Sequence, residues 1–316
     1  MTGHTEINAR DQKGIMFMSV SSPDAARQLI RAKAKDILVS YHYIKTNGIY
    51  EREILDEIDA LGGYFMTDSG AFTIFGQYKG KRIPDEIRTE EYWLPYIEEY
   101  VKFLSDNSHK IYVAANLDLD NIVGRDVVDR WNETYFKPLE KAMNMIYITQ
   151  QDDGYYADLN GMKRLKEYCA IHDYVGVNAG FAKQVNLVAQ QARITNTRIH
   201  GFALTGTQTL VKYPLFSVDS TTWLGGARYG TTYVNKGFNN FSLWDYKHKH
   251  YRKSLKFNLS PLVDFDKFLA DDVEAVNYQN IHGWWEGIRY PFLKACELKL
   301  SSQKASYYDK RGNRGY

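Results

Sequence analysis

Short apolar segments alternate along the chain with longer amphipathic ones. Eight of the apolar segments are rich in β-branched and aromatic residues and have the length of buried strands. They are 15–20, 36–41, 64–67, 111–117, 145–149, 174–177, 198–204 and 215–218. The segments between most of them carry charged residues at helical spacing, and 22–24 reads Ser-Pro-Asp, a helix-start signal. This alternation predicts an α/β protein built on a parallel sheet.

Eight strands favour a closed TIM-type eight-stranded β/α barrel with insertions. The long interval 76–107 before the fourth predicted strand indicates an insertion, and we expect Pro95 to kink or break the helix there. The interval before the last strand leaves room for about two helical turns. An open doubly wound sheet is the alternative, but no GxGxxG motif follows an early strand. We expect a single barrel domain over 1–316, with a flexible tail from about 303.

Polar side chains follow the predicted strands at their carboxyl ends, which meet on one face of a β/α barrel. They are His42, Asp68, Ser69, Asp118, Asp120, Gln150, Gln151, Asn178, Thr205, Asp219 and Ser220. Asp is common in turns and helix caps, so each carboxylate taken alone has a structural interpretation. Three strands that all end in carboxylates predict a shared site.

Paired carboxylates facing one site can divide the work of glycosyl transfer. One attacks the anomeric carbon, the other acts as general acid/base, and a second acceptor displaces the covalent glycosyl-enzyme. A third carboxylate beside an amide suits recognition of a purine. The carboxylate accepts hydrogen bonds from guanine N1–H and the exocyclic amine, and a Gln side chain can donate to O6.

Two motifs resemble those of the tRNA-guanine transglycosylase superfamily. TDSGAF at 67–72 resembles its TDSGGF motif, and FSVDSTTWLGGARYG at 216–230 resembles the segment that bears its nucleophilic aspartate. Between them, NLDLD, YITQ and VGVNAG fall where that family keeps its guanine-reading residues. The resemblance runs from about Tyr64 to Gly230.

The resemblance implies a role for each matching residue. Asp219 would be the nucleophile at C1′ and Asp68 the general acid/base. The predicted base-binding residues are Ser69, Gly70, Asp118, Gln150 and the backbone near Gly176. Asp120 competes with Asp118 for the reading role because the motif match there is short.

The tRNA enzymes of this superfamily carry a CxCxxC…H zinc site after the nucleophile strand. This chain has two cysteines, Cys169 and Cys296, and no such cluster, so we expect no zinc subdomain, no metal and no cofactor. The compact form, with HGFALTG before the nucleophile segment, resembles the phage and bacterial DNA branch, DpdA, whose members exchange guanine in DNA for a 7-deazaguanine base. The implied activity is that of a pentosyltransferase acting on DNA through a covalent aspartyl-deoxyribose intermediate.

Three alternatives remain open from the sequence. One is guanine exchange in tRNA, of the queuosine or archaeosine type, against which the missing cysteine cluster argues. Another is a non-catalytic nucleic-acid-binding subunit, since a barrel keeps its fold when chemistry is lost. The third is a glycoside hydrolase, which would not need Gln150 and a third Asp for reading a base.

Charge along the chain bears on the partner. The net charge of +2 does not by itself predict a polyanionic partner. The segment 246–257, however, holds five Lys or Arg residues and two His among aromatic residues, and it holds no acidic residue. We expect a basic nucleic-acid-contacting region around 228–257, with contacts from Arg228, Lys247, Lys249, Arg252 and Lys253. His42 and His200 have both substrate-contacting and structural interpretations. For Trp223 both packing on the base or sugar and packing in the core are open, and core packing is favoured.

The expected location is cytoplasmic, in the host cytoplasm if the chain is phage-encoded. No apolar run reaches the ~20 residues of a membrane span, and the polar first residues lack a signal-peptide core. The expected partners are DNA, with tRNA as the alternative, and a 7-deazaguanine base, without a membrane. A homodimer is left open.

Overall fold

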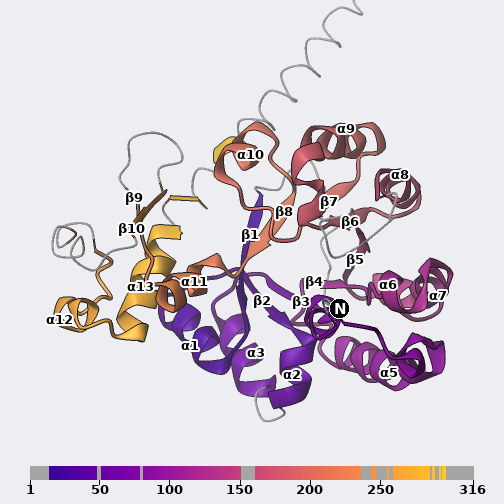
Figure 1. Cartoon of the computed structure of the whole chain (residues 1–316), viewed down its shortest axis with the longest axis horizontal. Helices are drawn as coiled ribbons and strands as arrows, with labels where there is room; N and C mark the ends of the chain where they lie inside the picture. Colours follow the sequence, from indigo (N-terminus) through magenta and orange to yellow (C-terminus); the bar gives the residue numbers. More distant parts are fainter. Residues whose placement is uncertain are drawn as a thin grey trace, which may run out of the picture.

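Eight parallel strands close into a barrel in chain order, at the centre of the molecule in Figure 1. The structure, a computed structural model, describes residues 14–47, 51–78, 81–150, 161–235, 243–246, 255, 259–284, 287–288, 292 and 294–296. The strands are β1 (Ile15–Val20), β2 (Ile37–Ser40), β3 (Phe65–Asp68), β4 (Val113–Ala115), β5 (Asn144–Thr149), β6 (Tyr174–Val177), β7 (Arg198–Gly201) and β8 (Ser217–Ser220). Pairing of β8 with β1, with Phe17 opposite Asp219, completes the ring. The predicted TIM-type barrel is confirmed.

Helices cover the outside of the barrel (Figure 1). They are α1 (Pro23–Arg31), α2 (Tyr41–Asn47), α3 (Glu51–Ala60), α4 (Ala71–Gly76), α5 (Glu90–Asp106), α6 (Asp120–Val123), α7 (Arg125–Trp131), α8 (Gly161–Ile171), α9 (Val185–Thr195), α10 (Thr207–Lys212) and α11 (Thr222–Tyr229). Short 3₁₀ turns lie at Asp85–Arg88, Lys137–Lys141 and Ala179–Gln184, and a π turn at Asn132–Phe136. None of the helices in the described part of the chain is long and apolar enough to cross a membrane.

The long interval between β3 and β4 holds α4, a 3₁₀ turn and α5. The break considered at Pro95 does not occur, because α5 runs through it from Glu90 to Asp106. A proline removes one i→i−4 hydrogen bond, whereas α5 buries five large side chains against the barrel, which are Trp93, Ile97, Tyr100, Phe103 and Leu104. Packing of one helix face therefore outweighs the local preference.

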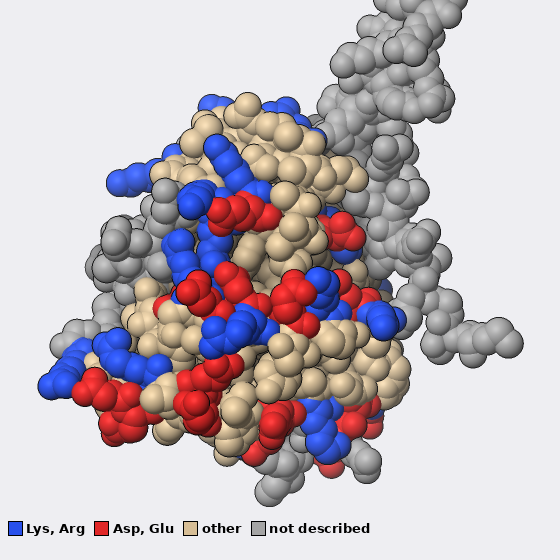
Figure 2. Space-filling model, turned by 90° about the vertical axis from the view of Figure 1, so that its right-hand side faces the viewer, with Lys and Arg blue, Asp and Glu red and all other residues tan. Residues whose placement is uncertain are grey.

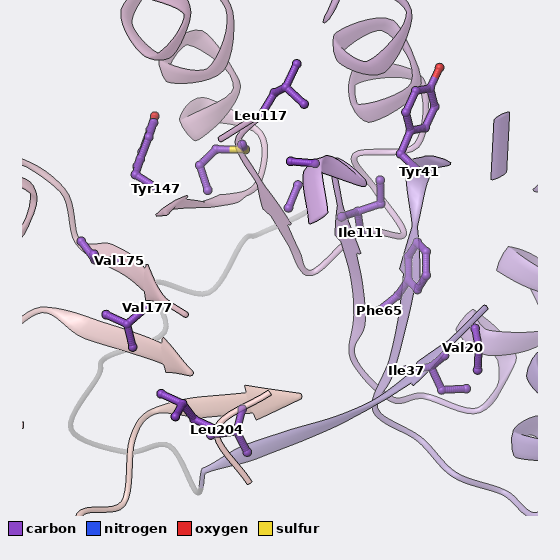
Figure 3. Close-up of a cluster of buried hydrophobic side chains, with 14 of the residues drawn as sticks. Val20, Ile37, Tyr41, Phe65, Ile111, Leu117, Tyr147, Val175, Val177 and Leu204 are labelled. Carbon is purple, nitrogen blue, oxygen red and sulfur yellow. The ribbon is translucent and has the colours of Figure 1, made fainter. Parts of the chain in front are cut away.

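Side chains along each strand alternate between the barrel interior and the surrounding helices. The interior is apolar near the amino ends of the strands, where Ile15, Phe17, Leu38, Met66, Val113, Ala115, Ile146, Ile148 and Tyr174 form one buried cluster. The intervening positions pack against the helices in a larger cluster, part of which Figure 3 shows, including Phe65, Val175 and Val177. Continuing the interior positions toward the carboxyl ends gives polar residues, which are Ser19, Ser40, Asp68, Gln150, His200 and Asp219. One end of the barrel is thus an apolar plug and the other a polar mouth.

A further unit follows the barrel, and the sequence pattern did not predict it. It consists of the antiparallel pair β9 (Thr232–Asn235) and β10 (Leu243–Tyr246) with α12 (Phe265–Leu269) and α13 (Val273–Trp284), at the left of Figure 1. Buried amides of α13 bind the backbone of β9: Asn280 Oδ1 accepts from Tyr233 N at 2.9 Å, and Gln279 Nε2 donates to Tyr233 O at 3.0 Å. Side chains of α13 thereby replace a third strand.

We predict that Asn280→Ala destabilises the protein by about 1–3 kcal/mol, because it removes the hydrogen bond from the Tyr233 N–H to the buried Asn280 side chain. Urea unfolding measures this change. Asn186→Ala, the same substitution at an exposed position of α9, serves as control and should stay within about 0.5 kcal/mol. Equal effects for the two variants would contradict the role assigned to Asn280.

Candidate active site

Asp219 is held at the barrel mouth by three hydrogen bonds. Ser19 Oγ donates to Oδ2 at 2.7 Å, while the Ala203 backbone N–H and His200 Nε2 reach Oδ1 at 3.1 and 3.2 Å. These groups come from β1, from the segment after β7 and from β7 itself. Hydrogen bonds of this kind stabilise a carboxylate in its charged form and fix its orientation. These contacts therefore fix the orientation of the Asp219 carboxyl group, whose side chain is 12% exposed.

The Ala203 donor depends on an uncommon backbone conformation. Its φ is +54°, in the left-handed region that residues with a side chain seldom adopt. Such conformations cost about 1–3 kcal/mol and persist where the surrounding structure imposes them. Here the conformation accompanies an N–H directed at the Asp219 carboxylate.

Asp68 is the last residue of β3 and differs from Asp219 in its surroundings. Burial raises the pKa of Asp68, and the charge of Asp219 adds to the rise; the Ser40 hydroxyl and the Gly70 amide oppose it. The Gly70 N–H donates to Oδ1 at 2.8 Å. Asp68 thus keeps its proton to higher pH than an ordinary aspartate. A pair of carboxyl groups with unlike environments can supply one acid and one anion in a single site.

The residues after Asp68 form a tight turn that only glycine fits. Gly70 has φ +81°, and a Cβ there would lie 2.4 Å from His42 Cβ and 3.0 Å from Ser40 Oγ. The Ser69 carbonyl accepts the Tyr96 hydroxyl at 2.6 Å, which ties the turn to α5. The predicted pocket residues Ser69 and Gly70 therefore lie beside Asp68 in a rigid turn.

Asp118 and Gln150 are in direct contact. Gln150 Nε2 donates to Asp118 Oδ2 at 2.5 Å and to the Asp118 carbonyl at 3.1 Å. Burial raises the pKa of Asp118 well above its usual range, and the charges of Asp120 and Asp68 add to the rise. With the Gln150 nitrogen engaged, its Oε1 is buried without a hydrogen-bond partner among the described residues. The free group of Gln150 is therefore an acceptor, and not the donor expected from the sequence.

Asp120, the competitor of Asp118, lies in an ion pair. Arg164 Nη2 is 3.0 Å from Asp120 Oδ1 and 2.8 Å from Asp129 Oδ1. The side chains of Arg164 and Asp120 are 6% and 4% exposed, so the pair joins α8 to the start of α6 in the interior. Asp118, in contrast, is near enough to Asp68 for the two charges to interact.

The remaining predicted residues have varied placements. Gly176 lies in β6, where a Cβ would be 2.6 Å from the Phe202 ring and 2.8 Å from Ile146, so packing explains this glycine. Arg228 is in α11, but its side chain lies outside the described part of the structure. The same holds for Lys247, Lys249, Arg252 and Lys253, for Gln151 and for the tail from 303.

Three further residues have defined surroundings. His42 lies at the start of α2 beside Gly70, and burial lowers its pKa. Trp223 is fully buried and donates to the Ser19 carbonyl at 3.1 Å, so its expected core position is confirmed. Ser19 was not singled out from the sequence. Its spacing of two from Phe17 and of four from Ile15 would have placed it in the barrel interior.

Metal ligands were also considered. The described residues contain no group of three or more His, Cys, Asp or Glu side chains that could hold a metal ion. Both cysteines are buried and neither forms a disulfide, and burial raises the pKa of Cys169 to about 11.

Comparisons with known proteins found only remote similarity to solved structures. No protein-family model and no curated sequence matches the chain. Similar solved structures include orotidine 5′-monophosphate decarboxylase from Methanocaldococcus jannaschii, complexed with the inhibitor BMP (13% identity, 66% of this chain and 89% of that one, TM-score 0.42). Another is tryptophan synthase from M. tuberculosis (11% identity, 85% and 93% covered, TM-score 0.43). A third is 3-dehydroquinate dehydratase from Geobacillus kaustophilus (11% identity, 66% and 82% covered, TM-score 0.41). Similarity this remote concerns the barrel alone.

We predict that Asp118→Asn stabilises the protein at pH 7.5. Since the folded-state pKa of Asp118 is raised, folding favours its neutral form, and stability falls as pH rises from about 4 toward that pKa. The neutral amide removes this penalty and still accepts the Gln150 N–H. The gain should be several degrees in melting temperature at pH 7.5 and should vanish near pH 3.5.

Asp126→Asn, at an exposed position of α7, is the matched control, for which no pH-dependent gain is expected. A melting temperature of Asp118→Asn equal to or below that of the wild type at pH 7.5 would overturn the assignment.

Proposed function

We propose that the protein is a guanine transglycosylase that exchanges guanine in DNA for a 7-deazaguanine base. The observation that carries the proposal is the unlike pair at the barrel mouth: Asp219, with three hydrogen bonds, and Asp68, with a raised pKa. The charge of Asp219 contributes to the shift of Asp68, so the two groups act in one electrostatic environment. The motifs at 67–72 and 216–230 support the same pairing of roles.

In the first half of the reaction Asp219 attacks C1′ while Asp68 gives its proton to the departing guanine. The C1′–N bond breaks, the base leaves with its electron pair, and an aspartyl-deoxyribose ester forms. In the second half Asp68, now a base, takes the proton of the incoming 7-deazaguanine, whose nitrogen attacks C1′ and releases Asp219. Guanine and its replacement exchange with no net hydrolysis, provided water stays out of the mouth.

The proposed reader of the base is the pair Asp118 and Gln150. The Asp118 carboxyl and the free Gln150 Oε1 offer acceptors to adjacent N–H groups. Guanine carries such groups at N1 and at its exocyclic amine. The amide nitrogen of Gln150 is engaged by Asp118, so in this arrangement O6 is not read by Gln150.

A DNA substrate places demands on the surface around the mouth. The target base must leave the stack at a cost of a few kcal/mol, and phosphates must be held during that time. On the face shown in Figure 2, Lys and Arg side chains lie among Asp and Glu. The proposed backbone contacts therefore come from Arg228 and the basic stretch 246–257. Guanine exchange in tRNA stays the alternative substrate assignment.

Exchange of labelled guanine in DNA and in tRNA, with a panel of 7-deazaguanines, tests the proposal. Wild-type protein should exchange guanine in DNA, and Asp219→Asn should lose both exchange and covalent trapping on guanine-containing DNA. Asp68→Asn should still bind and should exchange about 10²–10⁴-fold more slowly. Because the acid must be protonated, base release should slow as pH rises through the raised pKa of Asp68. A covalent adduct that survives in Asp219→Asn would contradict the assignment of Asp219 as nucleophile. Exchange in tRNA alone would show that tRNA, and not DNA, is the substrate.

Replacing guanine by hypoxanthine in the substrate tests the reading pair. Hypoxanthine lacks the exocyclic amine, which leaves one buried acceptor unpaired and costs about 1–3 kcal/mol, or roughly 5–150-fold in kcat/KM. Gln150→Glu is the matched variant. It keeps Oε1 and the length of the side chain, but it replaces Nε2, the donor to Asp118, by an oxygen. Equal kcat/KM for the two bases in the wild type would contradict the proposed contact.

A further inference from the structure

A chain of hydrogen bonds leads from Asp219 into the barrel interior. His200 Nε2 is 3.2 Å from Asp219 Oδ1, and His200 Nδ1 is 2.7 Å from Ser217 Oγ. Ser217 Oγ is in turn hydrogen-bonded to the Tyr174 hydroxyl. His200 and Ser217 are fully buried and Tyr174 is 1% exposed, so bulk water does not reach the three side chains. None of them contacts a reacting atom in the proposed reaction, and Tyr174 and Ser217 have no role in it so far.

Counting hydrogens fixes the direction of this chain. Three hydrogen bonds join the four groups, and neutral His200 with Tyr174 and Ser217 supplies three hydrogens. They satisfy all three bonds in one way: Tyr174 O–H to Ser217 Oγ, Ser217 O–H to Nδ1, and Nε2–H to Asp219. An imidazolium would bring a fourth hydrogen and leave one buried hydroxyl without an acceptor in the described structure, which is unfavourable. The other neutral tautomer would turn a nitrogen lone pair toward the Asp219 carboxylate.

The packing around the imidazole holds it in this chain. The Phe202 ring lies edge-on at 4.3 Å between centroids, and the Phe17 ring lies tilted at 6.1 Å. A ring in this position cannot reorient without displacing two aromatic neighbours. The tautomer is therefore set by Ser217 and Tyr174, and the position of the ring by Phe17 and Phe202.

We propose that Tyr174, Ser217 and His200 are positioning residues that keep an Nε2–H donor on Asp219 and so hold the nucleophile as an oriented anion. The proposal rests on the proposed role of Asp219 as nucleophile. Tyr174 and Ser217 act through His200 and touch no reacting atom. Loss of the Ser217 hydroxyl frees Nδ1 to carry the hydrogen, which converts the Asp219 contact from attraction to repulsion.

The tautomer of His200 is measured by long-range ¹H–¹⁵N correlation NMR on histidine-labelled full-length protein. The chain has eight histidines, and the spectrum of His200→Asn identifies the missing signals. The wild type should show a protonated Nε2 and a bare Nδ1. Ser217→Ala should shift the population toward Nδ1–H, and Tyr174→Phe, which keeps the ring packing, should do so to a smaller extent. A wild-type His200 with Nδ1–H, or with both nitrogens protonated, would overturn the proposal.

Kinetics provide the second readout. Ser217→Ala should lower kcat for guanine exchange about tenfold or more, as a wrong imidazole tautomer does in other sites, while KM changes less than twofold. Tyr174→Phe should follow in the same direction. A changed tautomer with unchanged kcat would refute the positioning role. Absence of exchange and trapping in the wild type would count against the proposed function, and the NMR result would then still decide whether the hydrogen-bond chain has the assigned direction.

Discussion

The site depends on the two-residue repeat of a strand inside a closed barrel. Each strand can direct only alternate side chains inward, and parallel pairing brings all the carboxyl ends to one rim. Phe17, Met66 and Ile148 face inward at one depth of the barrel. Two residues further along the same strands, Ser19, Asp68 and Gln150 face inward at the next depth. Closure between β1 and β8 then brings Ser19 against Asp219. The geometry of the barrel thus determines which side chains are in contact, and the chemistry of these side chains determines the properties of the site.

This repeat explains why much of the fold was predictable from sequence. The apolar runs at 15–20 and 174–177 coincide with β1 and β6, and the other strands shift by one to three residues at their ends. Asp68 and Asp219 come at strand ends, where the residue pattern alone predicts them to converge. Of the kink or break expected at Pro95, the break does not occur, because the buried face of α5 holds the helix together.

Other features of the site depend on partners distant in sequence. Asp118 and Asp120 are two positions apart and have similar sequence surroundings, yet only Asp120 forms an ion pair with Arg164 of α8. The orientation of the Gln150 amide follows from Asp118, 32 residues away. The sequence pattern also did not predict the unit formed by β9 and α13. Side-chain amides of α13 take the place of a third strand there, and a third strand would have had a recognisable periodic pattern.

The contact between Ser19 and Asp219 spans 200 residues of chain. During synthesis on the ribosome, β1 emerges early and must wait until β8 has left the exit tunnel before the carboxylate receives this donor. A nascent chain that has formed seven strands still exposes the edges of β1 and β7 and lacks the Ser19 contact to Asp219. Completion of the ring and completion of the candidate site are therefore the same late event in folding, which couples chemical competence to the integrity of the whole barrel.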